Sequence, residues 1–542
     1  MSTFDREAAL AQLGTEDFDV LVVGGGVTGA GVTLDAAARG LRTALVERDD
    51  WASGTSSKSS KLVHGGLRYL QQKEYRLVYE NLAERQRLLV NAPHLVQELP
   101  FLIPLFGRNG VVNAAVAKGY STALWLYDLT GGLRIGKAHR RVTPEEALRH
   151  LPSLRADRVV AAFLYYDART DDARLTLTLA RTAVLDHGAV AANHVGVAAL
   201  EHDGTGRITG ARLTTGGRVG AACVVNAGGV WADDVRALDG GVHPDSIRPA
   251  KGIHITVPRA RLQCDIAAVI PVSGDGRSIF VVPWGTHTYV GTTDTDYAGP
   301  LDDPSCTPED IAYLLRAVNA VTTARLAAED ITGTWAGLRP LVKNAATERT
   351  ADLSRRHRVE TAASGLVTVT GGKLTTYRKM AADTVDAVVG VLGRGAGRSP
   401  TARLRLRGAV GLDYLRRPGT AARLGVAPDV LDHLLDRFGA ETTRVLAAAR
   451  PDPTLLEPLV PGLPYLRVEA VWAVQAEMAG TLEDVLSRRT RGLLLDREAT
   501  VAAAPAVAAL IGPQLGWDRA EQARQVADIT GLAARERDAV GA

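Results

Sequence analysis

The start of the chain carries a pattern of apolar runs and glycines that predicts a strand, a helix and a second strand. Residues 18–23 form an apolar, β-branched run that ends at glycines, which is typical of a buried strand. Residues 30–39 are rich in alanine and precede Gly40, as expected of a helix and its end. Residues 43–46 form a second apolar run. The pattern therefore predicts a βαβ unit.

Farther along, the spacing of apolar residues changes with each segment. Residues 74–90 and 308–330 repeat apolar residues at helical spacing. Residues 187–197 are expected to form a strand. Between residues 248 and 294, short apolar runs are separated by glycine and proline, which predicts a mainly antiparallel sheet. The apolar, aromatic stretch 111–132 predicts either a helix packed on the core or a surface that seats on a membrane.

The last third of the chain reads as a separate helical region. Residues 393–401 are rich in glycine, arginine and serine, which is typical of a linker. Beyond them, alanine, leucine and charged residues recur at helical spacing up to the C-terminus. With 542 residues, the chain is longer than one hydrophobic core usually supports, so two or three domains are expected.

Composition narrows the class of protein. A content of 46% hydrophobic and 23% charged residues is ordinary for a soluble enzyme. The net charge of +3 is too small to indicate nucleic-acid binding but is compatible with an anionic membrane or an acidic substrate. The cysteines are far apart, which predicts neither a metal site nor a disulfide and favours a reducing cytoplasm. No apolar stretch reaches the roughly 18 residues that span a bilayer, so membrane contact is expected to be peripheral.

The glycines of the βαβ unit match a dinucleotide-binding fingerprint. Gly24, Gly26 and Gly29 have the G-x-G-x-x-G spacing, which allows a tight turn, a close approach to a pyrophosphate and helix–strand packing. Glu47 follows the second strand, where a carboxylate holds a ribose 2′-hydroxyl. The unit predicts FAD or NAD without separating them, and its place at the start of a long chain favours FAD.

Three stretches of the chain resemble one family of flavoproteins. The run TSSKSSKLVHGGLRYL at residues 55–70 is the signature of the FAD-dependent glycerol-3-phosphate dehydrogenases. The run GGKLTTYR at residues 371–378 and the helical region around residues 476–491 are also similar to this family. The resemblance covers nearly the whole chain.

The resemblance implies an α/β fold built from three parts. The first is a Rossmann-type FAD-binding domain, similar to glutathione reductase and D-amino-acid oxidase and split over about 17–100, 160–240 and 335–397. An antiparallel-sheet substrate domain is expected at about 101–159 and 241–334. An all-α C-terminal domain is expected at 398–542.

The resemblance also implies site residues. His254 is the expected general base, although a buried histidine on a strand is more often a core residue. Arg339 and Lys373 complete the catalytic set, and Tyr69 is expected to contact the substrate. Phosphate would be held by arginines, because a guanidinium matches phosphate oxygens; these are Arg68 and Arg355, with Arg356 and Arg358 as alternatives to the latter. FAD would be held by Gly24, Gly26, Gly29, Glu47, Thr55, Ser56, Ser60, Lys61, His64, Gly65, Val195, Gly228, Gly372 and Thr375.

The implied reaction is oxidation of sn-glycerol 3-phosphate to dihydroxyacetone phosphate, with electrons passed to a membrane quinone. The alternative is an oxidase that uses oxygen and releases hydrogen peroxide. An amine or amino-acid oxidase, or a flavin-binding regulatory protein without turnover, would have no use for the residue 55–70 run or for the catalytic set. The expected location is the cytoplasm, with the protein peripheral to an anionic membrane surface; a homodimer is compatible with the sequence.

Overall fold

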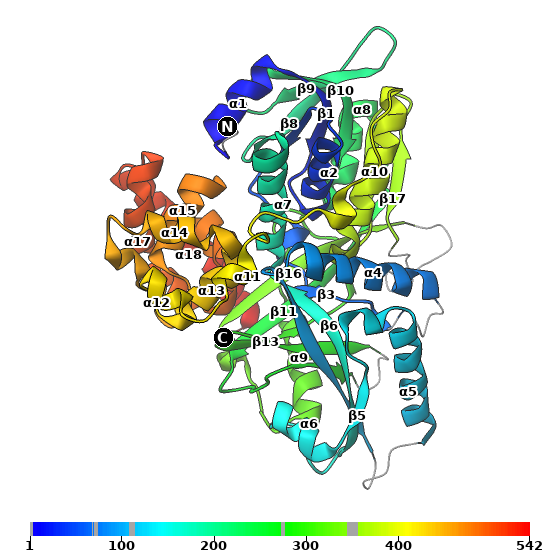
Figure 1. Cartoon of the computed structure of the whole chain (residues 1–542), viewed down its shortest axis with the longest axis vertical. Coiled ribbons are helices and arrows are strands. Elements are labelled where there is room, and N and C mark those ends of the chain that lie inside the picture. Colours follow the sequence, from blue (N-terminus) through cyan, green and yellow to red (C-terminus); the bar gives the residue numbers. More distant parts are fainter. Residues whose placement is uncertain are drawn as a thin grey trace.

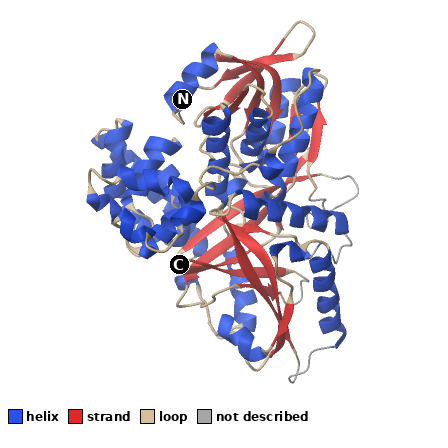
Figure 2. Ribbon diagram, viewed as in Figure 1, coloured by secondary structure: helices blue, strands red, loops and turns tan. Residues whose placement is uncertain are grey.

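The computed structural model describes residues 4–67, 69, 74–107, 114–272, 277–343 and 356–541 (Figure 1). The chain forms two sheets, one above the other in the view of Figure 1, and a helical lobe beside them made by the C-terminal residues. Figure 2 shows that this lobe is helical, whereas the other two parts combine helices and strands.

The first sheet is built around the predicted βαβ unit. Its main path is β17-β18-β10-β1-β2-β7, and β9 pairs with both β10 and β8. The pairs β18–β10, β10–β1, β1–β2 and β2–β7 are parallel. The strands are β1 Asp17–Val23, β2 Thr43–Val46, β7 Val190–Ala192, β8 Val197–His202, β9 Ile208–Leu213, β10 Arg218–Asn226, β17 Arg358–Thr361 and β18 Val367–Thr370.

This sheet is covered on both faces, which explains the unbroken apolar run of its first strand. Val20 and Val22 point into a core made with α2 (Val27–Ala38), α7 (Asp172–His187) and α10 (Tyr377–Leu392). Leu21 and Val23 point to the opposite side, toward α1 (Arg6–Thr15) and the β8–β9 hairpin. A strand buried on both faces has no polar side, as in other parallel sheets.

The second sheet is the predicted antiparallel one. Its path is β15-β11-β14-β13-β12-β4-β6-β3, with β16 paired to β11 and β5 to β6. Every pair is antiparallel except β12 with β4. The strands are β3 Leu62–Val63, β4 Val96–Phe106, β5 Arg140–Val142, β6 Val159–Thr170, β11 Ile247–Pro258, β12 Ala267–Pro271, β13 Ser278–Trp284, β14 His287–Gly291, β15 Thr295–Asp296 and β16 Gly333–Val342.

Helices cover the two faces of the second sheet separately. On one face, Ile253 and Ile255 pack with α9 (Pro308–Val321); α6 (Pro144–His150) adds to the same core. The other face packs with α4 (Tyr75–Asn91) and α5 (Ala114–Leu129). The predicted substrate domain gives way to the FAD-binding domain near residues 159 and 334. Strands β6 and β16 of the second sheet continue past these positions, and the domain boundaries remain a prediction.

The region predicted as a strand at residues 187–197 is mostly not one. Its strand, β7, is confined to Val190–Ala192. His187 still belongs to the preceding helix, and His194 has a φ of +53°, which no extended strand contains.

The C-terminal lobe is helical, as predicted. Its helices are α11 Leu412–Leu415, α12 Thr420–Leu424, α13 Pro428–Phe438, α14 Thr442–Ala448, α15 Arg467–Glu477, α16 Gly492–Leu495, α17 Arg497–Ile511 and α18 Arg519–Val540. The segment from Arg497 to Leu515 is long and apolar enough to cross a membrane by composition alone. Its residues Val507 and Ile511 are buried in the core of the lobe together with Ile529 of α18. Of its apolar window, 39% is buried inside the structure.

Candidate active site

Two cavities, each of about 360 Å³, meet between the two sheets. The first, here called the nucleotide cavity, lies at the carboxyl ends of β1, β2 and β10. The second, here called the substrate cavity, lies over the face formed by β11 and β16. Thr55, Pro340, Gly372, Lys373 and Leu374 line both. A long ligand can therefore extend from the sheet edge, where dinucleotides bind in this type of fold, into the second cavity.

The glycine fingerprint forms the wall of the nucleotide cavity. Gly24 has a φ of +110°, and a Cβ there would lie 2.6 Å from the carbonyl oxygen of Ala227. A Cβ on Gly29 would lie 1.8 Å from the carbonyl oxygen of Gly24, so α2 could not approach the turn. At the start of α2, the backbone N–H of Val27 donates to Ser56 Oγ at 2.9 Å. A helix N-terminus held against a glycine turn is a site for a pyrophosphate.

Glu47 lines the same cavity from the end of β2. Its carboxylate accepts hydrogen bonds from the backbone N–H of Gly25 at 2.5 Å and of Asp49 at 2.8 Å. Burial raises the pKa of Glu47 to about 7, although these two donors act in the opposite direction. Val195 and Gly228, both predicted to hold FAD, also line this cavity.

The substrate cavity has a floor of paired strand residues. In the β11–β16 register, His254 lies opposite Trp335, Gly252 opposite Gly337, and Ala250 opposite Arg339. Because alternate residues share a face, His254 and Arg339 lie on one side with the glycine pair between them. A Cβ on Gly252 would lie 2.5 Å from Thr292 Oγ1. A side chain on either glycine would collide with its neighbours, so the glycine pair lets Thr292 and the backbone of Lys58 pack closely against the strands between the histidine and the arginine.

His254 is both a buried strand residue and a cavity residue. Its side chain points away from the α9 face, and the residue is 2% exposed. Nε2 lies 2.9 Å from Ser60 Oγ, and the ring stacks on Trp335 with centroids 4.6 Å apart. Burial lowers the pKa of His254 well below 6.5, and the charges of Lys61 and Arg339 add to this effect. The ring is therefore neutral near pH 7 and able to accept a proton.

The cationic residues of the catalytic set also line the substrate cavity. Arg339 donates from Nη1 to Asp294 Oδ1 at 2.9 Å, and from Nη2 to Thr292 Oγ1 and the Thr293 carbonyl, each at 3.2 Å. Lys373 Nζ lies 3.8 Å from the centroid of the Tyr69 ring. The two cations and His254 surround one cavity.

The other predicted residues fall into three groups. Ser60, His64 and Thr375 line the substrate cavity, and the backbone N–H of His64 donates to Thr375 Oγ1 at 3.2 Å. Gly29, Lys61 and Gly65 do not line either cavity in the described part of the chain: Lys61 Nζ bonds to Asp172 at 3.0 Å, and the Gly65 N–H donates to Tyr127 Oη at 3.0 Å. Arg68 and Arg355 lie outside the described residues.

The alternatives to Arg355 lie elsewhere. Arg356 pairs with Glu74 and Arg358 with Glu360, and both side chains are exposed and absent from the described lining of the cavities.

Several cavity residues carry no signal in the sequence. Arg277 lines the substrate cavity and donates from Nη1 to the carbonyl of Asp294 at 2.8 Å, the residue that also pairs with Arg339. Thr214 and Trp231 line the nucleotide cavity, with the Arg48 guanidinium 5.0 Å from the centroid of the Trp231 ring. These residues reach the site through strand pairing and turns that no local pattern reveals.

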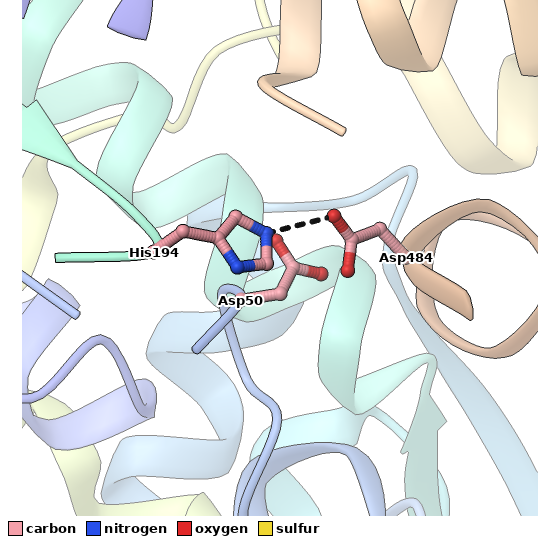
Figure 3. Close-up of side chains that lie close together, drawn as sticks. All are labelled: Asp50, His194 and Asp484. Carbon is pink, nitrogen blue, oxygen red and sulfur yellow. Dashed lines mark hydrogen bonds and ion pairs between the residues drawn. The ribbon is translucent and has the colours of Figure 1, made fainter. Parts of the chain in front are cut away.

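A cluster of Asp50, His194 and Asp484 lies apart from the cavities (Figure 3). His194 Nε2 lies 3.0 Å from Asp484 Oδ2. Asp50 also accepts from Arg488 Nε at 2.7 Å and from Arg489 at 2.6 and 2.8 Å. Because two guanidinium groups neutralise its carboxylates, the cluster is an ion-pair network rather than a cation site.

Comparison with known proteins agrees with this geometry. The family model "FAD dependent oxidoreductase" matches residues 19–378, and the model "C-terminal domain of alpha-glycerophosphate oxidase" matches residues 399–522. The structure of the glycerol-3-phosphate dehydrogenase from Bacillus halodurans with FAD aligns over 99% of each chain, with a TM-score of 0.80 and 31% identity. Fold and site thus define an FAD-dependent oxidoreductase, and FAD is its cofactor.

Sequence relatives narrow the class to one family. Glycerol-3-phosphate dehydrogenase 2 of Mycobacterium tuberculosis is 44% identical over 530 residues, which cover 96% of this chain and 89% of that protein. The mitochondrial glycerol-3-phosphate dehydrogenase of Homo sapiens is 38% identical over 552 residues, covering 96% of this chain and 74% of that protein. The chain belongs to the FAD-dependent glycerol-3-phosphate dehydrogenase family.

Proposed function

We propose that the protein oxidises sn-glycerol 3-phosphate to dihydroxyacetone phosphate and passes the electrons to a membrane quinone. The observation that carries the proposal is the substrate cavity, in which a buried neutral histidine and two cations surround a space that continues into the nucleotide cavity. The relatives are named for this substrate.

The cavity residues divide the reaction between them. Bound FAD supplies the acceptor for the hydride that leaves the carbinol carbon. His254 takes the hydroxyl proton, because its ring is neutral and lines the substrate cavity. Arg339 stabilises the negative charge that develops on the alcohol oxygen, held in place by Asp294. Loss of the proton and the hydride leaves the ketone.

Charge and shape also support the assignment of the remaining roles. Lys373 lies at the junction of the two cavities, where it can contact the substrate hydroxyl or the flavin, and Tyr69 forms a wall beside it. Arg68 and Arg355 stay our candidates for the phosphate. Arg277 shares Asp294 with Arg339 and adds a guanidinium to the same cavity.

Helix α5 supports the proposal of a quinone acceptor at a membrane surface. The stretch predicted as a core helix or a membrane surface has both properties: Leu124 and Tyr127 are buried, whereas Trp125 is 55% and Leu129 71% exposed. Tyr120 of the same helix lines the substrate cavity. The protein would thus sit peripherally on the inner face of the cytoplasmic membrane, with its apolar helix face next to the cavity.

The test is anaerobic reduction of the bound flavin by sn-glycerol 3-phosphate, followed by addition of either a soluble quinone or oxygen. We expect bleaching and rapid reoxidation with the quinone only. Rapid reoxidation by oxygen with release of hydrogen peroxide would assign the protein to the oxidases. A flavin that stays oxidised in the presence of substrate would contradict both.

A further inference from the structure

The C-terminal lobe contacts the loop that carries Ser60, here called the serine loop and comprising residues 57–61. Arg491 lies between a π-helical turn, η10 (Asp484–Arg489), and α16 of the lobe, and its side chain is 1% exposed. Its Nη2 donates to the carbonyl of Ser57 at 2.7 Å and to Asp172 Oδ1 at 2.6 Å. Its Nη1 donates to the carbonyl of Ser487 at 3.0 Å, and the ion pair with Asp172 offsets the cost of burying the charge.

Asp172 binds the other end of the same loop. Its carboxylate accepts from Lys61 Nζ at 3.0 Å and from the backbone N–H and Oγ of Ser59 at 3.0 and 2.6 Å. Lys61 Nζ also donates to the Ser57 carbonyl at 2.9 Å, and its backbone has a φ of +57°. One carboxylate and one guanidinium therefore hold a short loop in a conformation that is uncommon for a residue other than glycine.

The conformation of the serine loop determines where Ser60 points. The Ser59 carbonyl accepts from Trp335 Nε1 at 3.2 Å, and the Ser60 carbonyl accepts from Tyr289 Oη at 2.8 Å. With both carbonyls directed to the floor of the substrate cavity, Ser60 Oγ lies 2.9 Å from His254 Nε2. This bond fixes the ring plane of His254 and the direction in which its other nitrogen points.

We infer that Arg491 is a positioning residue for His254, and that the C-terminal lobe orients the proton acceptor through the serine loop. The inference deepens the proposed function and rests on it for the role of His254. Without Arg491, the Ser57 carbonyl loses one of its two donors and Asp172 loses a cation. Ser60 would then no longer be held against the histidine.

The test compares two substitutions in the full-length protein with FAD bound. Arg491→Met removes the hydrogen bonds to Ser57 and Asp172 together with the one to Ser487, and Arg491→Lys keeps the charge but offers a single nitrogen in place of the guanidinium fork. Glu441→Gln is the matched control, because Glu441 also joins the lobe to the rest of the chain through a buried pair with Arg181 of α7 but touches no residue of the serine loop in the described structure.

Two readouts separate positioning from loss of structure. Hydrogen exchange of the peptide that covers residues 57–63 needs no substrate. We expect Arg491→Met to speed this exchange and Glu441→Gln to leave it unchanged. For substrate-dependent flavin reduction, we expect Arg491→Met to lower the maximal rate at least about tenfold while KM changes much less, because a small misplacement of a catalytic group is costly. Arg491→Lys should fall between Arg491→Met and wild type.

A double-mutant cycle completes the test. In a chain that already carries Ser60→Ala, Arg491→Met should lower the rate by less than about twofold, because both changes remove the same interaction. Unchanged exchange at residues 57–63, or fully additive rate losses, would overturn the inference. The two proposals can fail separately. If Arg491→Met speeds exchange but sn-glycerol 3-phosphate does not reduce the flavin of the wild-type protein, the proposed substrate is overturned, whereas the contact of Arg491 with the serine loop stands.

Discussion

At the scale of single residues, His254 shows why burial alone does not identify a catalytic group. A histidine in the middle of a buried strand usually belongs to the core, and His254 is as buried as a core residue. Its neighbours make the difference, because the ring stacks on Trp335, lies 2.9 Å from Ser60 Oγ and lines the substrate cavity. The structure also supplies a second buried histidine, His287, for comparison.

We predict that His254→Gln lowers the rate of flavin reduction by about 10²- to 10⁴-fold, since it removes the group that accepts the proton. FAD content should stay unchanged, because His254 lines only the substrate cavity. Anaerobic stopped-flow absorbance measures the rate. His287→Gln is the control: His287 is 6% exposed on β14 and lines neither described cavity, so its loss should change the rate by less than about twofold. Equal losses in the two variants would mean that His254 is a structural residue.

The lowered pKa of His254 also predicts a pH effect on stability. In the unfolded chain its pKa is near 6.5, whereas in the folded chain burial keeps it well below that value. As the pH falls below 6.5, the unfolded chain therefore binds a proton that the folded chain does not, and the free energy of unfolding decreases. His254→Gln removes this pH-dependent contribution to the free energy of unfolding. We expect wild type to lose more thermal stability than the variant between pH 7 and pH 5. Melting curves of both proteins at several pH values measure this difference. Equal decreases in melting temperature for the two proteins would contradict the prediction.

At the scale of elements, helices and strands with a regular local pattern could be predicted. The βαβ unit, α4, the antiparallel sheet and the helical C-terminal region each carry apolar residues at the expected spacing, and the structure contains all of them. The strand predicted at residues 187–197 failed because the chain turns at His194, which lies next to Asn193 and close to Gly196, two residue types that are common in turns.

Residues of the site could be predicted only where the glycine fingerprint or the family signature names them. Trp335 lies against His254 because β11 and β16 pair in one register, and Arg277 reaches Arg339 through Asp294. Register and side-chain pairing across strands far apart in the chain depend on the whole fold, so local periodicity does not contain them. Lys61 is a residue that the family signature names but that does not line either described cavity, because its ammonium group pairs with Asp172.

Helix α5 carries a prediction that belongs to this scale. Its exposed apolar side chains, Trp125 and Leu129, would lose contact with water on seating in a bilayer surface. Leu129→Glu should weaken sedimentation with vesicles that contain anionic lipid by at least about tenfold, because a charge replaces an apolar anchor. Val242→Glu is the matched control: Val242 is 73% exposed but lies beyond α8 (Ala232–Gly240) on the first-sheet side of the molecule. Equal binding by both variants would argue that α5 does not face the membrane.

At the scale of the whole molecule, the part built on the first sheet and the C-terminal lobe share one set of buried charges. Arg174 and Arg181 of α7 pair with Glu477 and Glu441 of the C-terminal lobe. Asp50, which follows the strand that ends near Glu47, pairs with Arg488 and Arg489. These charged side chains are all buried, so the lobe and the first-sheet part each supply the ion-pair partners of the other's charges. The lobe is therefore part of the folded unit that holds the cofactor.

This sharing predicts that residues 1–397 do not fold without the lobe. Removing one partner of a buried ion pair costs about 3–5 kcal/mol, and several such pairs would be broken against a total stability of about 5–15 kcal/mol. The truncated chain should give little soluble protein and no bound FAD, and co-expression of residues 398–542 should restore both. As a control, a protease site inserted at the exposed Gly395 and then cleaved should leave the two pieces associated, because the contacts that join them do not depend on the linker. A soluble, FAD-loaded fragment that unfolds cooperatively by itself would show that the buried charges find partners within the first two parts.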